Sequence, residues 1–213
     1  MPLSCRRFRK ANAMLKAFAL MSGLGFFTSS VLASEKVSAV TLDNLQAALN
    51  GESNAHARYL AFAKKADEEG YAGVASLFRA AARAEEIHAN NHAAVIRKSG
   101  GAAEAKLETP VVKSTRENLE AAIKGETFER DQMYPDFIRQ AQANPEALQT
   151  FEFALAAEAE HARLYSDALE NLESMTSRRT FYVCPVCGFT ARNPEVDSCP
   201  TCATSEELFE QVS

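Results

Sequence analysis

The chain has 213 residues, 46% of them hydrophobic and 24% charged, which is ordinary for a globular protein and argues against a disordered chain. It holds 28 acidic and 23 basic residues, a net charge of −5 at pH 7. Five of the basic residues lie within the segment 1–33, so the remaining chain carries a net charge of −10. We therefore expect no nucleic-acid partner.

The segment 1–33 has the three parts of a secretory signal peptide. A basic start without acidic residues is followed by an apolar run over 17–27, which is too short to span a bilayer. Small residues then predict cleavage after Ala33. We expect a periplasmic, exported protein. The alternatives are an uncleaved membrane anchor and a wrongly chosen start codon ahead of Met14 or Met21. The pair Arg6-Arg7 leaves both the general secretory and the twin-arginine routes open.

Four helices are expected in the next segment, 34–175, where glycine is sparse and alanine, leucine and glutamate recur with helical spacing. Ser114 and Glu117 have the spacing of a capping box, and Pro145 suits the first turn of a helix. The expected helices cover 41–69, 72–98, a segment that begins after Ser114, and 145–174.

The two halves of this segment repeat each other. In the second helix of each half, Glu85 and His88 recur as Glu158 and His161, at a sequence offset of 73. In the first helix of each half the offset is 74, and six residues are repeated. Asn44, Leu45, Ala47, Ala48, Gly51 and Glu52 in the first half correspond, in the same order, to Asn118, Leu119, Ala121, Ala122, Gly125 and Glu126 in the second. The chain is therefore interpreted as a duplicated helical hairpin.

The link between the halves, 100–113, has 14 residues and can stretch to about 46–50 Å, while a helix of about 29 residues is ~43 Å long. It is just long enough to run the length of a bundle. This predicts an all-α fold, a ferritin-like four-helix bundle with one long crossover.

Carboxylates and histidines recur at metal-ligand spacing. A step of three residues turns a helix by about 300°, so each Glu-x-x-His pair points one way. One glutamate from each of two helices plus two Glu-x-x-His pairs is the ligand set of di-iron and di-manganese carboxylate bundles. Four ionised carboxylates in a core without metal are costly, and imidazole favours iron over calcium. The expected ligands are Glu52, Glu85, His88, Glu126, Glu158 and His161.

Glu129 breaks the repeat, because its counterpart in the first half is Ala55. It lies one helical turn from Glu126 and is expected as a seventh ligand on one side, with a surface acid as the alternative. Tyr59 and Tyr134 are expected to hydrogen-bond ligand carboxylates, with simple core packing as the alternative.

The remaining histidines, His56 and His92, each lie four residues from an expected ligand and are not expected to bind metal themselves. Gly51 and Gly125 each precede an expected ligand, where glycine costs ~1 kcal/mol against alanine in a helix. Close approach of two helices at these glycines would explain that cost.

The last segment, 180–213, contains two Cys-x-x-Cys knuckles separated by eleven residues, formed by Cys184, Cys187, Cys199 and Cys202. The pattern indicates a tetrahedral thiolate metal site, although two disulfides are the usual alternative in an exported protein. The spacing alone leaves iron and structural zinc open. A redox metal next to a di-iron bundle serves as an electron relay, so iron is favoured. So small a domain needs its metal to fold.

These motifs resemble those of the rubrerythrins over 41–211. The resemblance rests on the stretches 51–53, 85–88, 125–129, 133–135 and 158–161, and on the two rubredoxin-like knuckles. It implies iron ligation by all six residues above and by Glu129, with Glu85 and Glu158 as bridges. It also implies that Glu129 and His88 exchange as ligands of one iron. Glu129, His88, Tyr59 and Tyr134 are the residues expected to act in the reaction.

The resemblance further implies reduction of hydrogen peroxide to water, with electrons passing through the rubredoxin-like iron. A ferroxidase or iron-handling protein that uses oxygen is the alternative. We expect an electron-donor protein outside the cytoplasm and a homodimer or higher homo-oligomer. The five-residue link 176–180 is expected to be too short to bring the four-cysteine site near its own bundle centre, which favours delivery from a neighbouring subunit.

Overall fold

The structure is a computed structural model that describes residues 37–193 and 197–213. The predicted signal peptide and its cleavage after Ala33 lie outside these residues. Within them, no helix is long and apolar enough to cross a membrane.

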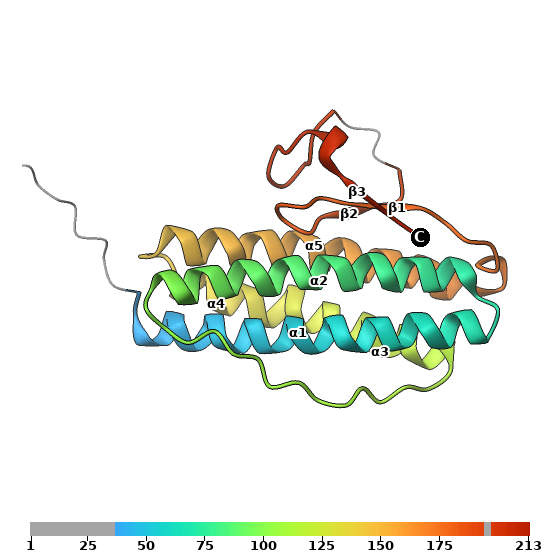
Figure 1. Cartoon of the computed structure of the whole chain (residues 1–213), viewed down its shortest axis with the longest axis horizontal. Helices are drawn as coiled ribbons and strands as arrows, with labels where there is room; N and C mark the ends of the chain where they lie inside the picture. Colours follow the sequence, from blue (N-terminus) through green and yellow to red (C-terminus); the bar gives the residue numbers. More distant parts are fainter. Residues whose placement is uncertain (1–36, 194–196) are drawn as a thin grey trace, which may run out of the picture. The chain divides into compact units, whose positions relative to one another are not determined.

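The predicted ferritin-like bundle is confirmed (Figure 1). Helices α1 and α2 pair as the first hairpin, and α5 pairs with α3 and α4 in the second. Ser38 caps α1, Ser114 forms the expected capping box with Glu117, and Asn144 caps α5 ahead of Pro145. The helices are α1 (Ala39–Glu68), α2 (Ala72–Lys98), α3 (Thr115–Phe128), α4 (Tyr134–Gln140) and α5 (Pro145–Glu170), followed by a 3₁₀ turn, η2 (Leu172–Ser174).

The crossover runs the length of the bundle along α1 (Figure 1). A stripe of amide side chains, spaced four residues apart on α1, binds its backbone. Asn50 Oδ1 accepts from Lys106 N at 2.8 Å, and Asn54 bonds both Lys106 O at 2.9 Å and Glu108 N at 2.8 Å. These amides satisfy backbone groups that have no helix or sheet of their own.

The third predicted helix is interrupted by a π-helix, η1 (Glu129–Met133), which separates α3 from α4. A π turn holds one extra residue. The repeat offset accordingly changes from 74 before it, at Glu52 and Glu126, to 75 after it, at Tyr59 and Tyr134. The extra residue enters where Glu129 departs from the repeat.

The C-terminal segment forms a three-stranded antiparallel sheet of order β2-β1-β3. Tyr182 at its centre pairs with Ala191 on one side and Gln211 on the other. Its strands are β1 (Phe181–Val183), β2 (Thr190–Ala191) and β3 (Glu210–Val212), with a 3₁₀ turn, η3 (Glu206–Leu208), before β3.

Strand β1 packs against α2 and lays Phe181 and Val183 into the core of the bundle. The expectation that the four-cysteine site cannot reach its own bundle centre is therefore wrong. That expectation counted only the link 176–180, whereas β1 is itself extended and continues the path along α2 at about 3.3 Å per residue.

The close helix approach expected at Gly51 and Gly125 is also wrong. A Cβ at either position would meet no described atom within 4 Å. Both residues are half-buried within their helices, and neither lies at a tight crossing.

Candidate metal centres

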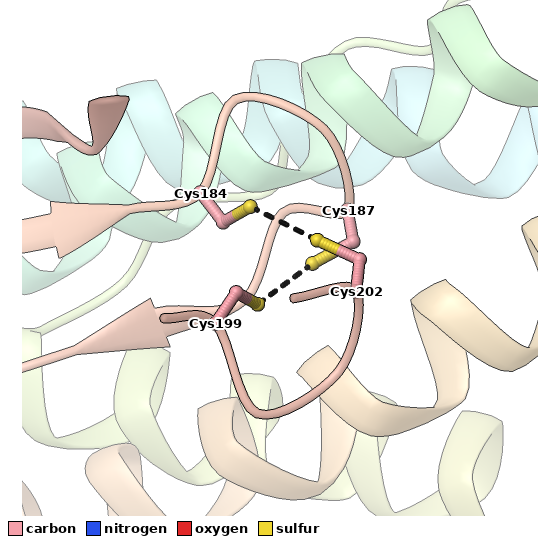
Figure 2. A group of neighbouring side chains, drawn as sticks. All are labelled: Cys184, Cys187, Cys199 and Cys202. Carbon is pink, nitrogen blue, oxygen red and sulfur yellow. Dashed lines mark hydrogen bonds between the residues drawn. The ribbon is translucent and has the colours of Figure 1, made fainter. Parts of the chain in front are cut away.

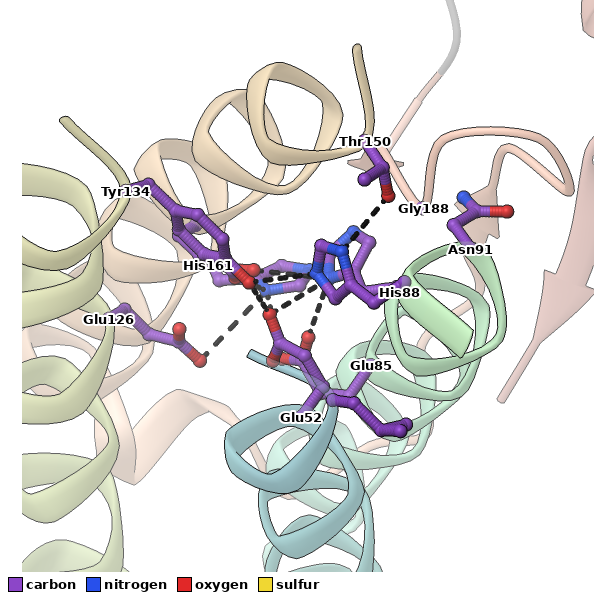
Figure 3. A network of polar contacts seen from close by, with 12 residues as sticks. Glu52, Glu85, His88, Asn91, Glu126, Tyr134, Thr150, His161 and Gly188 are labelled. Carbon is purple, nitrogen blue, oxygen red and sulfur yellow. Dashed lines mark hydrogen bonds and ion pairs between the residues drawn. The ribbon is translucent and has the colours of Figure 1, made fainter. Parts of the chain in front are cut away.

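Six buried side chains from four helices converge at the centre of the bundle (Figure 3). They fall into two sets of four, and within each set the ligand atoms lie within 4.8 Å of one another. Glu85 and Glu158 belong to both sets. We call these residues the six-residue group: Glu52 from α1, Glu85 and His88 from α2, Glu126 from α3, and Glu158 and His161 from α5.

The His88 ring is oriented by a hydrogen bond on its far side. Its Nε2 donates to the Cys187 carbonyl at 3.1 Å, because a carbonyl can only accept. In the neutral ring Nδ1 then carries a lone pair, and it lies 2.9 Å from Glu85 Oε2 and 3.1 Å from Glu158 Oε1. Such a lone pair would repel both carboxylate oxygens, so a proton or a metal ion must lie between them.

The His161 ring repeats this arrangement. Thr190 Oγ1 donates to Gly188 O at 3.1 Å, so it accepts from His161 Nε2, also at 3.1 Å. His161 Nδ1 then faces Glu158 Oε2 at 2.8 Å and Glu85 Oε1 at 3.3 Å. Two imidazole lone pairs and four carboxylates directed at one another form a donor set that fits two metal ions.

Protons compete with metal ions for this group. Burial and the surrounding carboxylates raise the pKa values of Glu52 and Glu126 well above the usual range of a glutamate. Burial acts to lower the pKa of His161, but the carboxylates of Glu85 and Glu158 raise it to about 9. Metal binding must therefore displace protons from this group.

Glu129 lies beside the six-residue group and in neither of its two sets. It is half-buried at the start of the π-helix. Burial, with the charges of Glu158 and Glu85, raises its pKa to about 8. His56 and His92 are also outside both sets. His56 Nδ1 instead donates to the Ala82 carbonyl at 2.7 Å.

The two tyrosines make the contacts expected of them. Tyr59 donates to Glu126 Oε1, and Tyr134 donates to Glu52 Oε1. Sequence reasoning missed the groups behind Tyr134, which are His92 and, bonded to it, Thr150. A signal for Thr150 was present, because its counterpart in the first half of the repeat is the apolar Leu77.

The four cysteines converge as the knuckle spacing predicted (Figure 2). Cys184 Sγ lies 3.5 Å from Cys202 Sγ, and Cys187 Sγ lies 3.4 Å from Cys199 Sγ. A disulfide has its sulfurs about 2.05 Å apart, whereas four thiolates about 2.3 Å from a common metal have separations near those found here. The arrangement fits a metal site and not two disulfides.

The four-cysteine site touches the six-residue group directly. Besides the bond from His88 to Cys187, a bidentate ion pair joins Arg83 on α2 to Glu210 on β3, at 2.6 and 2.8 Å. Asn91 Nδ2 donates to Val186 O at 2.9 Å. These contacts hold the first knuckle against α2.

The Rubrerythrin family model matches residues 43–169 of the chain. The chain belongs to the rubrerythrin family. Rubrerythrin-2 of Clostridium acetobutylicum is 38% identical over 178 residues, which cover 81% of this chain and 96% of that protein. Nigerythrin of Nitratidesulfovibrio vulgaris is 38% identical over 172 residues, 79% of this chain and 85% of that protein.

A structure of fully reduced, all-ferrous nigerythrin has a TM-score of 0.76 and 34% identity, and the match covers 92% of this chain and all of that one. The family and the donor sets together make this chain an iron-dependent redox protein. It has a di-iron site of the rubrerythrin type and a four-cysteine site suited to iron or zinc.

Proposed function

We propose that the chain is a peroxidase that reduces hydrogen peroxide to water at its di-iron site, with electrons supplied through its own four-cysteine site. The observation that carries the proposal is the hydrogen bond from His88 Nε2 to the Cys187 carbonyl. It joins a cysteine of the relay to a histidine of the six-residue group within one chain. A storage protein has no use for such a contact.

The proposed ligands of the two irons follow from the two sets of side chains. Glu52 and His88 from one set would hold one iron, and Glu126 and His161 from the other set would hold the second. Glu85 and Glu158, which occur in both sets, are proposed as bridges. Three buried carboxylate oxygens, from Glu52, Glu85 and Glu158, have no hydrogen-bond partner among the described residues, which supports their use as ligands.

When bound, the two irons supply the two electrons that cleavage of the oxygen–oxygen bond requires. The protein's own groups hold the site in shape. Tyr59 and Tyr134 each fix one terminal carboxylate by a hydrogen bond. Glu129 is proposed as the carboxylate that exchanges with His88, since it lies beside the group without belonging to either set. Burial of all six ligands excludes water and competing reactions.

Stopped-flow mixing of the fully reduced protein with hydrogen peroxide tests the proposal. We expect the irons to be oxidised within seconds, with slower oxidation by dissolved oxygen. Rapid reaction with oxygen, slow reaction with peroxide and accumulation of ferric mineral would instead identify a ferroxidase. Iron analysis should give three irons per chain, or two if the four-cysteine site holds zinc.

We also propose export of the chain, on the sequence of the segment 1–33. The mass of the mature protein from a periplasmic extract should correspond to cleavage after Ala33. The electron donor is then a protein outside the cytoplasm. Whether the chain forms a homodimer is decided by sedimentation of the metal-loaded protein.

A further inference from the structure

A chain of buried hydrogen bonds leads away from the six-residue group. Tyr134, which donates to Glu52, lies with its hydroxyl 3.3 Å from His92 Nε2. On the other side of that ring, His92 Nδ1 lies 3.1 Å from Thr150 Oγ1. Phe151 packs against both the His92 and Tyr134 rings, with centroids 5.4 and 6.1 Å away. The middle of the hydrogen-bonded chain is therefore packed against an apolar side chain.

The donors in this chain all point toward Glu52. Because Tyr134 gives its hydrogen to Glu52, its oxygen accepts from His92 Nε2–H. Burial, together with the nearby His88, lowers the pKa of His92 to about 3, so the ring is neutral. With one proton on Nε2, its Nδ1 accepts from the Thr150 hydroxyl. An unbroken order of donors is what stepwise proton transfer requires.

The outer end of this hydrogen-bonded chain, Thr150, lies at a surface pocket. Thr150 is 5% exposed and lines a surface pocket of about 380 Å³ between α2, α5 and the first cysteine knuckle. Lys98, Glu146 and Gln149 at this pocket are exposed. We call it the outer pocket. Water and buffer acids have direct access to it.

The other half of the repeat lacks such a path. There Tyr59 donates to Glu126, but the position of His92 is occupied by Tyr165. The Tyr165 hydroxyl has no hydrogen-bond partner among the described residues. The position of Thr150 is occupied by Leu77, which is fully buried. The bundle thus has a hydrogen-bonded path at Tyr134 and no such path at the equivalent position in the other half of the repeat.

We propose that His92 and its two partners, Thr150 and Tyr134, relay protons from the outer pocket to the six-residue group. The proposal rests on the proposed peroxidase function, because each hydrogen peroxide takes up two electrons and two protons to give two waters. For each proton, Tyr134 releases its hydrogen toward Glu52 and takes one from His92 Nε2.

His92 takes its replacement proton at Nδ1 from Thr150, and a hydronium ion or buffer acid in the outer pocket restores the Thr150 hydroxyl. Each group thus gains one proton and loses one, so the buried segment carries no added charge after transfer. The next proton follows once the His92 ring has turned so that its protonated nitrogen again faces Tyr134.

Nitrogen-15 NMR of histidine-labelled, zinc-loaded protein tests the direction of the hydrogen bonds without peroxide. We expect His92 to be protonated on Nε2 and unprotonated on Nδ1. Thr150→Val, which keeps the shape of the side chain and removes the hydroxyl, should shift the His92 Nδ1 resonance and leave His88 and His161 unchanged. Protonation of His92 on Nδ1 would overturn the relay, because Thr150 then has no acceptor.

Steady-state peroxide turnover tests whether the proton relay is used in the reaction. Thr150→Val should lower turnover at least about tenfold and raise the solvent deuterium isotope effect, with iron content unchanged. His92→Ala should lower turnover further and regain part of it with added imidazole, which a purely structural role does not predict. The matched control is Tyr165→Phe, which removes the hydroxyl at the equivalent place in the other half and should change neither rate nor isotope effect.

Wild-type turnover and isotope effect in Thr150→Val, or equal losses in Thr150→Val and Tyr165→Phe, would refute the relay. If the wild-type protein itself does not turn over peroxide, the proposed function fails. In that case the NMR measurement still decides whether the hydrogen bonds run from Thr150 to Tyr134.

Discussion

Gly188 is the point at which the first cysteine knuckle meets the di-iron site, and its replacement by alanine tests that contact. A Cβ on Gly188 would overlap the His88 ring and lie 3.2 Å from the Ala84 carbonyl oxygen. Gly188 also has φ of +76°. The conformation alone does not demand glycine, since Ala203 occupies the equivalent place in the second knuckle at φ +59°.

The expected loss has two parts. Alanine at positive φ costs ~1–2 kcal/mol, and forcing a methyl group into an occupied contact costs a further ~1–3 kcal/mol. Gly188→Ala should therefore lower the free energy of unfolding by about 2–5 kcal/mol. The control is Gly70→Ala, at φ +83° with no described atom within 4 Å of the added Cβ, which should lose only about 1–2 kcal/mol.

Urea unfolding of the iron-loaded protein, followed by the thiolate-to-iron absorption of the four-cysteine site, measures this difference. Re-reduction of the oxidised di-iron site through the relay should also slow in Gly188→Ala and not in Gly70→Ala, because only the former moves the knuckle away from His88. Equal losses of stability in the two variants, or an unchanged re-reduction rate, would refute the assigned contact.

Four further substitutions give three separate tests. Glu129→Ala should keep both bundle irons but slow their oxidation by peroxide, whereas Glu85→Ala should lose iron because a bridge is removed; equal iron loss in the two would contradict the separate role of Glu129. Glu69 accepts from Thr115 N at 2.8 Å at the start of α3, and contact with the Thr115 side chain together with this backbone bond lowers the pKa of Glu69 to about 2. Glu69→Gln should thus cost ~1 kcal/mol in urea unfolding at neutral pH, a difference that shrinks as pH falls from 4.5 toward 2 because the carboxylate is then protonated in both states. Cys199→Ser should abolish sustained turnover with a protein donor while iron analysis still finds two irons in the bundle, and continued turnover would place electron entry elsewhere.

Much of the bundle was predictable because its signals are local. Helical spacing and the capping box at Ser114 depend on residues three or four positions apart, and Pro145 marks the first turn of α5 by itself. The second helix was predicted at its observed bounds. The repeat predicted that the six-residue group would converge, because the same spacing in both hairpins puts matching residues on matching helix faces. The π-helix was not predicted, although its extra residue is visible in the sequence as the change of the repeat offset from 74 at Glu126 to 75 at Tyr134.

The sequence by itself determined which chemical groups this protein brings together: four carboxylates and two histidines in a duplicated bundle, and four thiolates in two knuckles. Only the tertiary structure decided how they are connected. The bond from His88 to Cys187 joins residues 99 positions apart, and the bond from Thr150 to His92 joins residues 58 apart. Such contacts depend on the path of β1 along α2 and on which helices become neighbours. The physical reason is that local spacing sets the face on which a side chain lies, whereas the partner it meets is set by packing of the whole chain.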